Sequence, residues 1–356
     1  MCKKIFIILI TLLIHHASFS QVVLEANGPG DTYELINSVL TSPGGEVVEV
    51  PDCGHQEFGR HIDEVYDTEL RKYVFRFHIH VTPDNDRCMN YDRQRTEIKT
   101  YDKSPDNLIG TEGEVVRYKW KFKLDSDFQP SGSFTHLHQL KSVGSDEDSM
   151  PLITLTARKG TPDQLEIRYA ETYSQITLKK IELEPLKGTW VEVTETVTYG
   201  EKEAGGQYHI EIKTVNGNEE ILNYNNNIRT WKTDADFIRP KWGIYRSLND
   251  KDNLRDEIVL FADFSVEEIC TTINSPNETI SEDNIYPNPG TDSIFLNPNL
   301  KNIYTKMTCY DINGRVVLQK KITTQVIDVS ILKPGIYFLH FSNNNEVSRP
   351  YKLIIY

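Results

Sequence analysis

Three short segments of this sequence combine strand-like alternation with an unusual number of cationic and hydrogen-bonding side chains. They cover residues 92–101, 134–141 and 240–246. Successive side chains of a β-strand point to opposite faces, so each segment should present one polar face. The side chains on those faces are Arg93, Arg95, Glu97 and Lys99, then Gln139 and Lys141, then Lys241 and Tyr245. Guanidinium and ammonium groups pair with anionic groups, so the three faces together suit an extended anionic ligand.

The alternation leaves one ambiguity in the second segment. His136 and His138 fall on the face opposite Lys141, and a shift within the strand would bring either histidine to the polar face. In the third segment Gly243 leaves a gap in the polar face. Because glycine has no side chain, we expect a ligand chain to approach the backbone there.

The elements that must position these faces are β-strands. Within residues 21–270, alternation marks strands at 73–80, 115–124, 152–157, 165–169, 190–199 and 208–214, with turn-forming clusters between them. Helical periodicity is convincing only over residues 31–40. Many short alternating strands predict an antiparallel sandwich, and about 250 residues suit a β-jelly roll. We therefore predict an all-β jelly-roll domain over residues 21–270.

A second, smaller module follows. Residues 271–280 form a polar linker, and residues 281–356 carry further short strand patterns with an Asn313-Gly314 hairpin signal. The two parts differ in charge: the 46 acidic and 29 basic residues of positions 21–280 give −17, whereas residues 281–356 carry +2. We predict a small C-terminal β-sandwich.

Composition excludes several classes of protein. The whole chain of 356 residues carries −13, which argues against a general nucleic-acid binder because such proteins show a basic footprint. A multispanning membrane protein is excluded because a single apolar run approaches membrane length, Ile5 to Ile14 near the N-terminus. Lys3 and Lys4 before it and Ser18 and Ser20 after it predict a signal peptide over residues 1–20, and no membrane span.

Export permits disulfides. Four cysteines remain beyond the predicted signal peptide: Cys53, Cys88, Cys270 and Cys309. Cys53 and Cys88 flank one strand-like region, so we favour that pair, although the spacing alone does not fix the connectivity.

The C-terminal module resembles the sorting domain of the type IX secretion system of Bacteroidota. The resemblance is carried by Tyr286-Pro-Asn-Pro-Gly290, Tyr310-Asp-Ile-Asn-Gly-Arg315 and Leu332-Lys-Pro-Gly-Ile-Tyr-Phe338. It implies recognition by the type IX machinery and a secreted or cell-surface location. The alternative is an adhesive or carbohydrate-binding sandwich.

The main domain resembles the jelly-roll polysaccharide lyases, a group that includes alginate, glucuronan and heparin lyases. Arg95-Thr96-Glu97 matches the Arg-(Ser/Thr)-Glu strand of that group, and Lys241, Gly243 and Tyr245 match its Lys-x-Gly-x-Tyr strand. Lys141 replaces the histidine of its Gln-x-His strand. A lysine there is most similar to the jelly-roll ulvan lyases of marine Bacteroidota, whose substrate is a sulfated uronate polysaccharide.

The resemblance implies β-elimination beside a uronic acid. A cation must stabilise the charge that builds on the uronate carboxylate, a base must take the C5 proton, and an acid must protonate the leaving O4. We expect Arg95 and Gln139 to hold the carboxylate, Lys141 to act as base and Tyr245 as acid. Tyr245 could also perform both proton transfers. The expected substrate-binding residues are Gln139, Arg93, Glu97, Lys99, His138, Lys241 and Arg246, and Arg158 and Arg168 are candidates to extend the groove.

Several alternatives stay open from the sequence. The sandwich could bind carbohydrate without catalysis, or the lyase could act on alginate, glucuronan or a heparin-like polymer. A glycoside hydrolase would need two facing carboxylates, for which Glu97 and Glu166 are candidates. We assign no catalytic metal. Asp84–Asp86 and Asp250–Asn253 could hold Ca²⁺ as a structural ion, and His78 with His80 could bind a metal from one strand face. We expect a monomer.

Overall fold

The computed structural model describes residues 21–269, 285–297, 300–301, 304–312, 315–343, 348 and 351–356. The chain divides into two compact units, residues 1–271 and 272–356, which are treated separately below. The predicted signal peptide, the linker, Cys270 and the Asn313-Gly314 turn lie outside the described residues.

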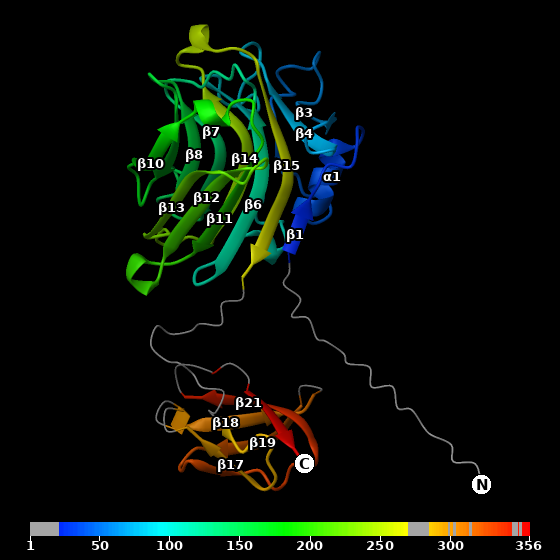
Figure 1. Cartoon of the computed structure of the whole chain (residues 1–356), viewed down its shortest axis with the longest axis vertical. Helices are drawn as coiled ribbons and strands as arrows, with labels where there is room; N and C mark the ends of the chain where they lie inside the picture. The colour runs from blue at the N-terminus through cyan, green and yellow to red at the C-terminus, as the bar shows by residue number, and fades with distance from the viewer. Residues whose placement is uncertain are drawn as a thin grey trace, which may run out of the picture. The chain divides into compact units, whose positions relative to one another are not determined.

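The first sheet of the larger unit is entirely antiparallel. Its strands, in spatial order, are β13 (Glu220–Asn227), β12 (Gln207–Thr214), β11 (Val191–Thr198), β6 (Val115–Leu124), β15 (Glu257–Glu268), β4 (Lys72–Ile79) and β3 (Ile62–Asp67), and β1 (Gln21–Leu24) pairs with β15. Figure 1 shows β11, β6 and β15 side by side in this layer.

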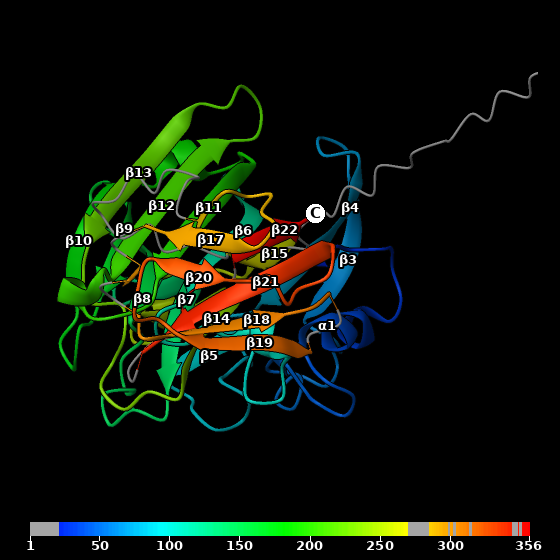
Figure 2. The same ribbon diagram turned by 90° about the horizontal axis from the view of Figure 1, so that it is seen from below.

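The second sheet is also antiparallel. Its order is β10 (Ile176–Glu182), β9 (Gln164–Tyr169), β8 (Ile153–Arg158), β7 (Thr135–Val143), β14 (Phe237–Ser247), β5 (Arg93–Lys99) and β2 (Val48–Glu49). Figure 2 shows the two sheets as layers, with the helix α1 (Thr32–Leu40) beside β3. All three polar segments singled out in the sequence are central strands of this second sheet.

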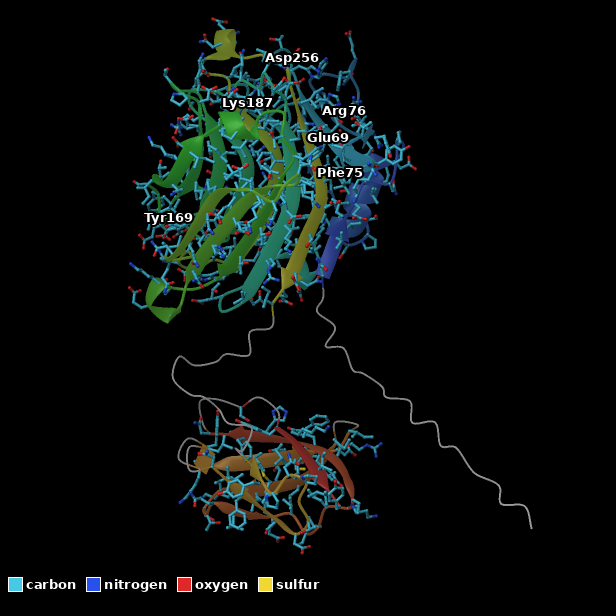
Figure 3. The ribbon with its side chains drawn as sticks, viewed as in Figure 1. Glu69, Phe75, Arg76, Tyr169, Lys187 and Asp256 are labelled. Carbon is cyan, nitrogen blue, oxygen red and sulfur yellow. A yellow bond between two sulfur atoms is a disulfide. The ribbon has the colours of Figure 1, made fainter. Side chains whose placement is uncertain are left out.

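The core of the unit lies between the two sheets. Alternation along β4 illustrates how it forms. Phe75 is fully buried, with its ring centroid 6.0 Å from that of Phe264. The next residue, Arg76, points outward and pairs with Asp63 at 2.6 Å (Figure 3). Trp120 of β6 and Trp242 of β14 meet across the layers, with ring centroids 6.1 Å apart. The predicted all-β jelly-roll sandwich is confirmed, and each strand predicted from alternation is present.

The smaller unit contains two antiparallel sheets over its own apolar core. One has the order β16 (Ile285–Tyr286), β17 (Ser293–Leu296) and β20 (Val326–Asp328). The other has the order β19 (Val316–Lys321), β18 (Lys306–Tyr310), β21 (Gly335–Ser342) and β22 (Tyr351–Ile355). This is the small β-sandwich predicted from the sequence.

Cysteine pairing follows the predicted pattern. Cys53 and Cys88 form a disulfide, and Cys309 is a buried free thiol in the smaller unit. Among the described residues, no helix has the length and apolar character needed to cross a membrane.

Candidate active site

A cavity of about 520 Å³ opens on the outer face of the second sheet, over β5, β7 and β14. It is lined by Glu49, Arg87, Arg93, Arg95, Lys99, Ser133, Phe134, His136, Gln139, Lys141, Ser149, Met150, Pro151, Arg158, Gln175, Arg239, Lys241 and Tyr245. Eight of these side chains are cationic and a single one is a carboxylate. The cavity is therefore strongly cationic, although the domain around it is acidic.

Strand register brings the predicted residues together. On β14, Tyr245 lies opposite Arg95 of β5 and His136 of β7. Lys241, four residues from Tyr245 on β14, lies opposite Lys99 of β5 and Gln139 of β7. The predicted residues at the cavity are Arg93, Arg95, Lys99, Gln139, Lys141, Lys241 and Tyr245, and of the two candidates to extend the groove Arg158 lines it and Arg168 does not.

A local irregularity decides which histidine reaches the cavity. The pairing of β7 with β8 shifts between His136 and His138, and its pairing with β14 shifts between Trp242 and Tyr245. A β-bulge changes the face to which the following residues point. Strict alternation put both histidines on the opposite face, but the shift brings His136 to the cavity wall.

At Gly243 the backbone of the neighbouring strand β5 lies too close for a side chain. Its φ is +144°, and a Cβ there would collide with the backbone carbonyl of Thr96 on β5. The chain that approaches this glycine is therefore the protein's own neighbouring strand, and Gly243 is not among the residues that line the cavity.

Three predicted binding residues do not reach the cavity. Glu97 is fully buried beneath it and accepts a hydrogen bond from Gln139. His138 lies in the core, 2.9 Å from Glu195 and packed on Trp120. Arg246 is also buried and donates to Gln94 at 2.8 Å and to the carbonyl of Arg255. His138 and Arg246 each precede or follow a residue that lines the cavity, Gln139 and Tyr245, so ordinary alternation along the strand turns their side chains to the core side.

Glu49 of the short edge strand β2 is a central residue that the sequence did not reveal. Its carboxylate pairs with Arg87 at 2.7 Å, Lys99 at 2.7 Å and Arg95 at 3.3 Å, and with Lys241. These cations outweigh the effect of burial and hold the pKa of Glu49 well below its usual range. A lone glutamate in a two-residue strand gives no signal in sequence, because its partners come from distant segments.

Arg95 is held by acidic side chains beneath the phenol ring of Tyr245. Its Nε donates to Asp86 at 2.8 Å, its Nη1 pairs with Glu97, and its Cζ lies 3.7 Å from the centre of the ring. Although burial works in the other direction, the neighbouring carboxylates raise the pKa of Arg95. The sequence assigned Arg95 to a substrate carboxylate, but the structure shows its guanidinium already occupied by protein carboxylates.

Lys141 has a contrasting environment. Among the described residues its Nζ makes neither a hydrogen bond nor an ion pair, and its pKa is lowered, chiefly by burial and further by Arg239 and Arg95. Burial also lowers the pKa of Lys241, to about 8, but that amine is ion-paired with Glu97 at 2.9 Å. Lys141 is thus an amine in the cavity with a free lone pair once it loses its proton.

His136 is an uncharged imidazole because it is buried. Burial lowers its pKa to about 3, and its Nδ1 lies 2.8 Å from the hydroxyl of Thr156. The ring stacks on Phe134. Tyr245 completes this end of the cavity, and its hydroxyl accepts a hydrogen bond from Arg93 Nη1 at 3.2 Å.

Comparison with known proteins agrees with this site. Residues 68–264 match the family model described as polysaccharide lyase, and residues 284–356 match the secretion system C-terminal sorting domain. No curated protein matches the chain.

Solved structures with a similar fold include two lyases and one hydrolase. An endo-β-1,4-glucuronan lyase from Trichoderma reesei is 14% identical over 69% of this chain and 94% of its own, with a TM-score of 0.44. A marine alginate lyase from Aplysia kurodai is 13% identical over 69% and 98%, with a TM-score of 0.48. The catalytic domain of a family 131 glycoside hydrolase from Coprinopsis cinerea is 17% identical over 59% and 78%, with a TM-score of 0.40.

The sorting domain directs the chain through type IX secretion to the cell surface or the extracellular space. The lyase model covers more than half of the chain, including β5, β7 and β14 with their cationic cavity. The chain therefore belongs to the polysaccharide lyase family, and it is an enzyme that cleaves polysaccharide by elimination.

Proposed function

We propose that the cavity cleaves a uronate-containing anionic polysaccharide, with ulvan as the preferred substrate. The observation that carries this proposal is the lining of eight cationic side chains against a single carboxylate. Such a concentration of one sign attracts a polyanion locally even though the domain is acidic, because salt screens charges beyond about 10 Å.

Lys141 is the proposed base. A general base works best when its pKa lies near the operating pH and its lone pair is free. Burial lowers the pKa of Lys141 from its usual range toward neutral pH, and the described residues leave its amine without a partner. His136 is the other neutral nitrogen on this wall, but a pKa of about 3 makes it a weak base.

Tyr245 is the proposed acid. Lys141 takes the C5 proton, the C5–H electron pair forms the C4–C5 double bond, and the C4–O4 bond breaks with its pair. Tyr245 then gives its proton to O4. Arg93 donates to the phenol oxygen at 3.2 Å, so it stabilises the negative charge that remains on Tyr245.

The carboxylate of the sugar needs a cation that is not already occupied. Arg95 is paired with Asp86 and Glu97, so we assign it to holding the Tyr245 ring. Arg239 is freer: its Nε has no hydrogen-bond partner among the described residues, and its Nη1 lies 3.5 Å from the Thr100 carbonyl. We therefore assign Arg239, with Gln139, to the uronate carboxylate.

Ulvan is preferred because its sulfate groups add a second anion to each uronate-containing repeat. One uronate needs one cation, yet Arg87, Lys99 and Arg158 line the same cavity beyond the groups used in catalysis. Arg87 and Lys99 share the carboxylate of Glu49, and Arg158 lies 3.5 Å from Glu166. We propose that a sulfate shares these cations with the protein carboxylates. Lys141 stands where jelly-roll lyases have the histidine of the Gln-x-His strand. A lysine there is most similar to the ulvan lyases, which supports the same substrate.

The test is to mix the full chain with ulvan, alginate, glucuronan and heparin, and to follow the ultraviolet absorbance of the unsaturated uronate. Elimination creates this conjugated group, whereas hydrolysis and binding do not. A rise with ulvan supports the proposal. A rise with another polymer alone would keep the mechanism and reject the ulvan assignment. Saturated new ends would indicate a hydrolase, and binding without new ends would indicate a binding module.

A further inference from the structure

A second cluster of functional side chains lies outside the cavity, where the loops next to β3 and β4 meet. It consists of His55, His61, His80 and Asp84, and one ligand atom of each lies within 4.8 Å of all the others. The Asp84 carboxylate is the common partner: it lies 2.7 Å from His55 Nδ1, 3.2 Å from His61 Nε2 and 3.0 Å from His80 Nδ1.

This arrangement differs from both metal sites considered in the sequence. His78 and His80 do not act together, because His78 turns away to Asp63 at 3.1 Å. Asp84 is surrounded by imidazole nitrogens rather than by oxygens. The Asp250 carboxylate accepts hydrogen bonds from Ser131 and Gly132 of a distant loop, so its two oxygens serve to hold the two loops together.

A second observation is the orientation of His61. Its Nδ1 lies 2.6 Å from Asp52, which also accepts a hydrogen bond from the hydroxyl of Tyr33 at 2.9 Å. This pair fixes the imidazole so that Nε2 faces the cluster. A histidine that binds a metal through one nitrogen commonly donates its other N–H to a carboxylate. His61 is fully buried, so its contact with Asp52 is made in the interior and not between exposed side chains.

The donor set selects the metal. Three imidazole nitrogens and one carboxylate oxygen suit Zn²⁺ in tetrahedral geometry, whereas Ca²⁺ takes six to eight oxygens. Zn²⁺ bonds of about 2.0–2.1 Å place tetrahedral ligands ~3.3 Å apart, so the cluster would have to contract modestly from its widest separation. Phe58 packs over His61 and His80, with ring centroids 4.8 and 4.3 Å away, and covers the cluster.

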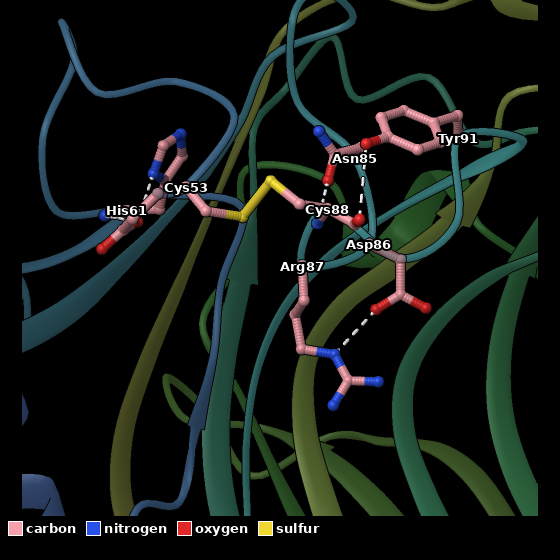
Figure 4. The surroundings of a disulfide bond; sticks show 8 residues. Cys53, His61, Asn85, Asp86, Arg87, Cys88 and Tyr91 are labelled. Atoms are coloured by element: carbon pink, nitrogen blue, oxygen red, sulfur yellow. Dashed lines mark hydrogen bonds and ion pairs between the residues drawn. A yellow bond between two sulfur atoms is a disulfide. The ribbon is translucent and has the colours of Figure 1, made fainter.

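We propose that His55, His61, His80 and Asp84 form a structural Zn²⁺ site. Four protein ligands leave no open position, which is typical of a structural rather than a catalytic zinc. The site joins the loop before β3 to the loop after β4, and the Cys53–Cys88 disulfide joins the same two loops (Figure 4). Zn²⁺ and the disulfide would together fix the loop between β4 and β5.

That loop forms part of the cavity. Asp86, two residues after Asp84, pairs with Arg95 at 2.8 Å, and Arg87 pairs with Glu49 at 2.7 Å. The zinc site is therefore expected to keep the catalytic wall in place without contacting the substrate. This inference does not depend on which polysaccharide is cleaved.

The first experiment measures metal in the full chain, purified without an affinity tag from medium that contains Zn²⁺, Ca²⁺ and Mg²⁺. Elemental analysis after dialysis should find about one Zn²⁺ per chain. His80→Ala should lower the zinc content at least tenfold. His78→Ala is the matched control, because His78 also packs on Phe58 but is not in the ligand set. Equal zinc in both variants, or no zinc in the unmodified chain, would overturn the proposal.

A second measurement covers the case in which His80→Ala fails to fold. The unmodified chain is stripped with a chelator and refilled with Co²⁺, which reports its ligands through visible absorption. A tetrahedral nitrogen–oxygen spectrum with one equivalent bound supports the site. A spectrum of octahedral aqueous Co²⁺, or binding of Ca²⁺ in place of Co²⁺, would reject it.

Discussion

Replacement of Lys141 by arginine keeps the positive charge in the cavity but removes the proposed base. Arginine keeps a cation at the same place on β7, but its guanidinium stays protonated at every accessible pH. Lys141 carries no hydrogen bond or ion pair within the described part of the chain, so the change breaks no contact that holds the fold. If Lys141 takes the C5 proton, Lys141→Arg should lose turnover while substrate binding remains.

The expected loss of turnover follows from the contribution that a general base makes to catalysis. General base catalysis contributes about 10²–10⁴-fold, which corresponds to about 2.7–5.4 kcal/mol of transition-state stabilisation. An ordinary lysine with a pKa of about 10.4 would be only about 0.4% neutral at pH 8. Burial and the neighbouring guanidinium groups lower the pKa of Lys141, so its neutral fraction is larger.

The pH profile distinguishes the two candidate bases. A lysine base predicts that kcat/KM rises with pH and levels off above the lowered lysine pKa. A base of pKa about 3, such as His136, predicts no ascending limb in the neutral range. Lys141→Arg should lower kcat with KM changed less than threefold, and Lys123→Arg, on the other sheet and paired with Glu69, is the matched control. A variant that keeps its kcat, or loses only affinity, would refute Lys141 as the base.

Further variants test the proposed acid, the glycine of β14 with a matched glycine control, and the disulfide. Tyr245→Phe should lower kcat by about 10²–10⁴-fold through loss of the acid, while equilibrium dialysis shows retained binding; unchanged turnover would remove Tyr245 from the mechanism. Gly243→Ala should destabilise the domain by more than the ~1–3 kcal/mol of backbone strain in a urea titration, because it also meets the β5 backbone. Gly30→Ala, at a similar φ of +147° in open space, isolates the strain, and equal losses would contradict the collision. Cys53→Ser with Cys88→Ser opens a crosslink over 35 residues, for which chain entropy gives about 4 kcal/mol in thermal unfolding, and an unchanged midpoint would contradict it.

Much of the fold could be predicted because alternation is a local signal. Phe75 and Arg76 illustrate it: adjacent residues point to opposite sides of β4, so the pattern indicates a strand before any partner is known. The three polar segments were visible for the same reason. Their neighbourhood on β5, β7 and β14 came from the family resemblance, since periodicity gives no pairing order.

The rest could not be predicted because it depends on exceptions to regular pairing and on distant partners. His136 reaches the cavity through an irregularity in β7, and no residue type in that strand marks the shift. Glu49 gathers cations from three other segments. The histidine cluster combines loops on both sides of β3 and β4, so its members look unrelated along the chain.

The ion pairs of the cavity divide its cations into two groups. Glu49, Asp86 and Glu97 neutralise Arg95, Lys99 and Lys241 from below. An amine paired with a carboxylate keeps its proton and cannot act as a base. The described residues leave Lys141 outside these pairs, so the cavity can hold many cations and still contain one amine that loses its proton. Three buried carboxylates thus stabilise the paired cations of this wall, while Lys141 stays outside these pairs.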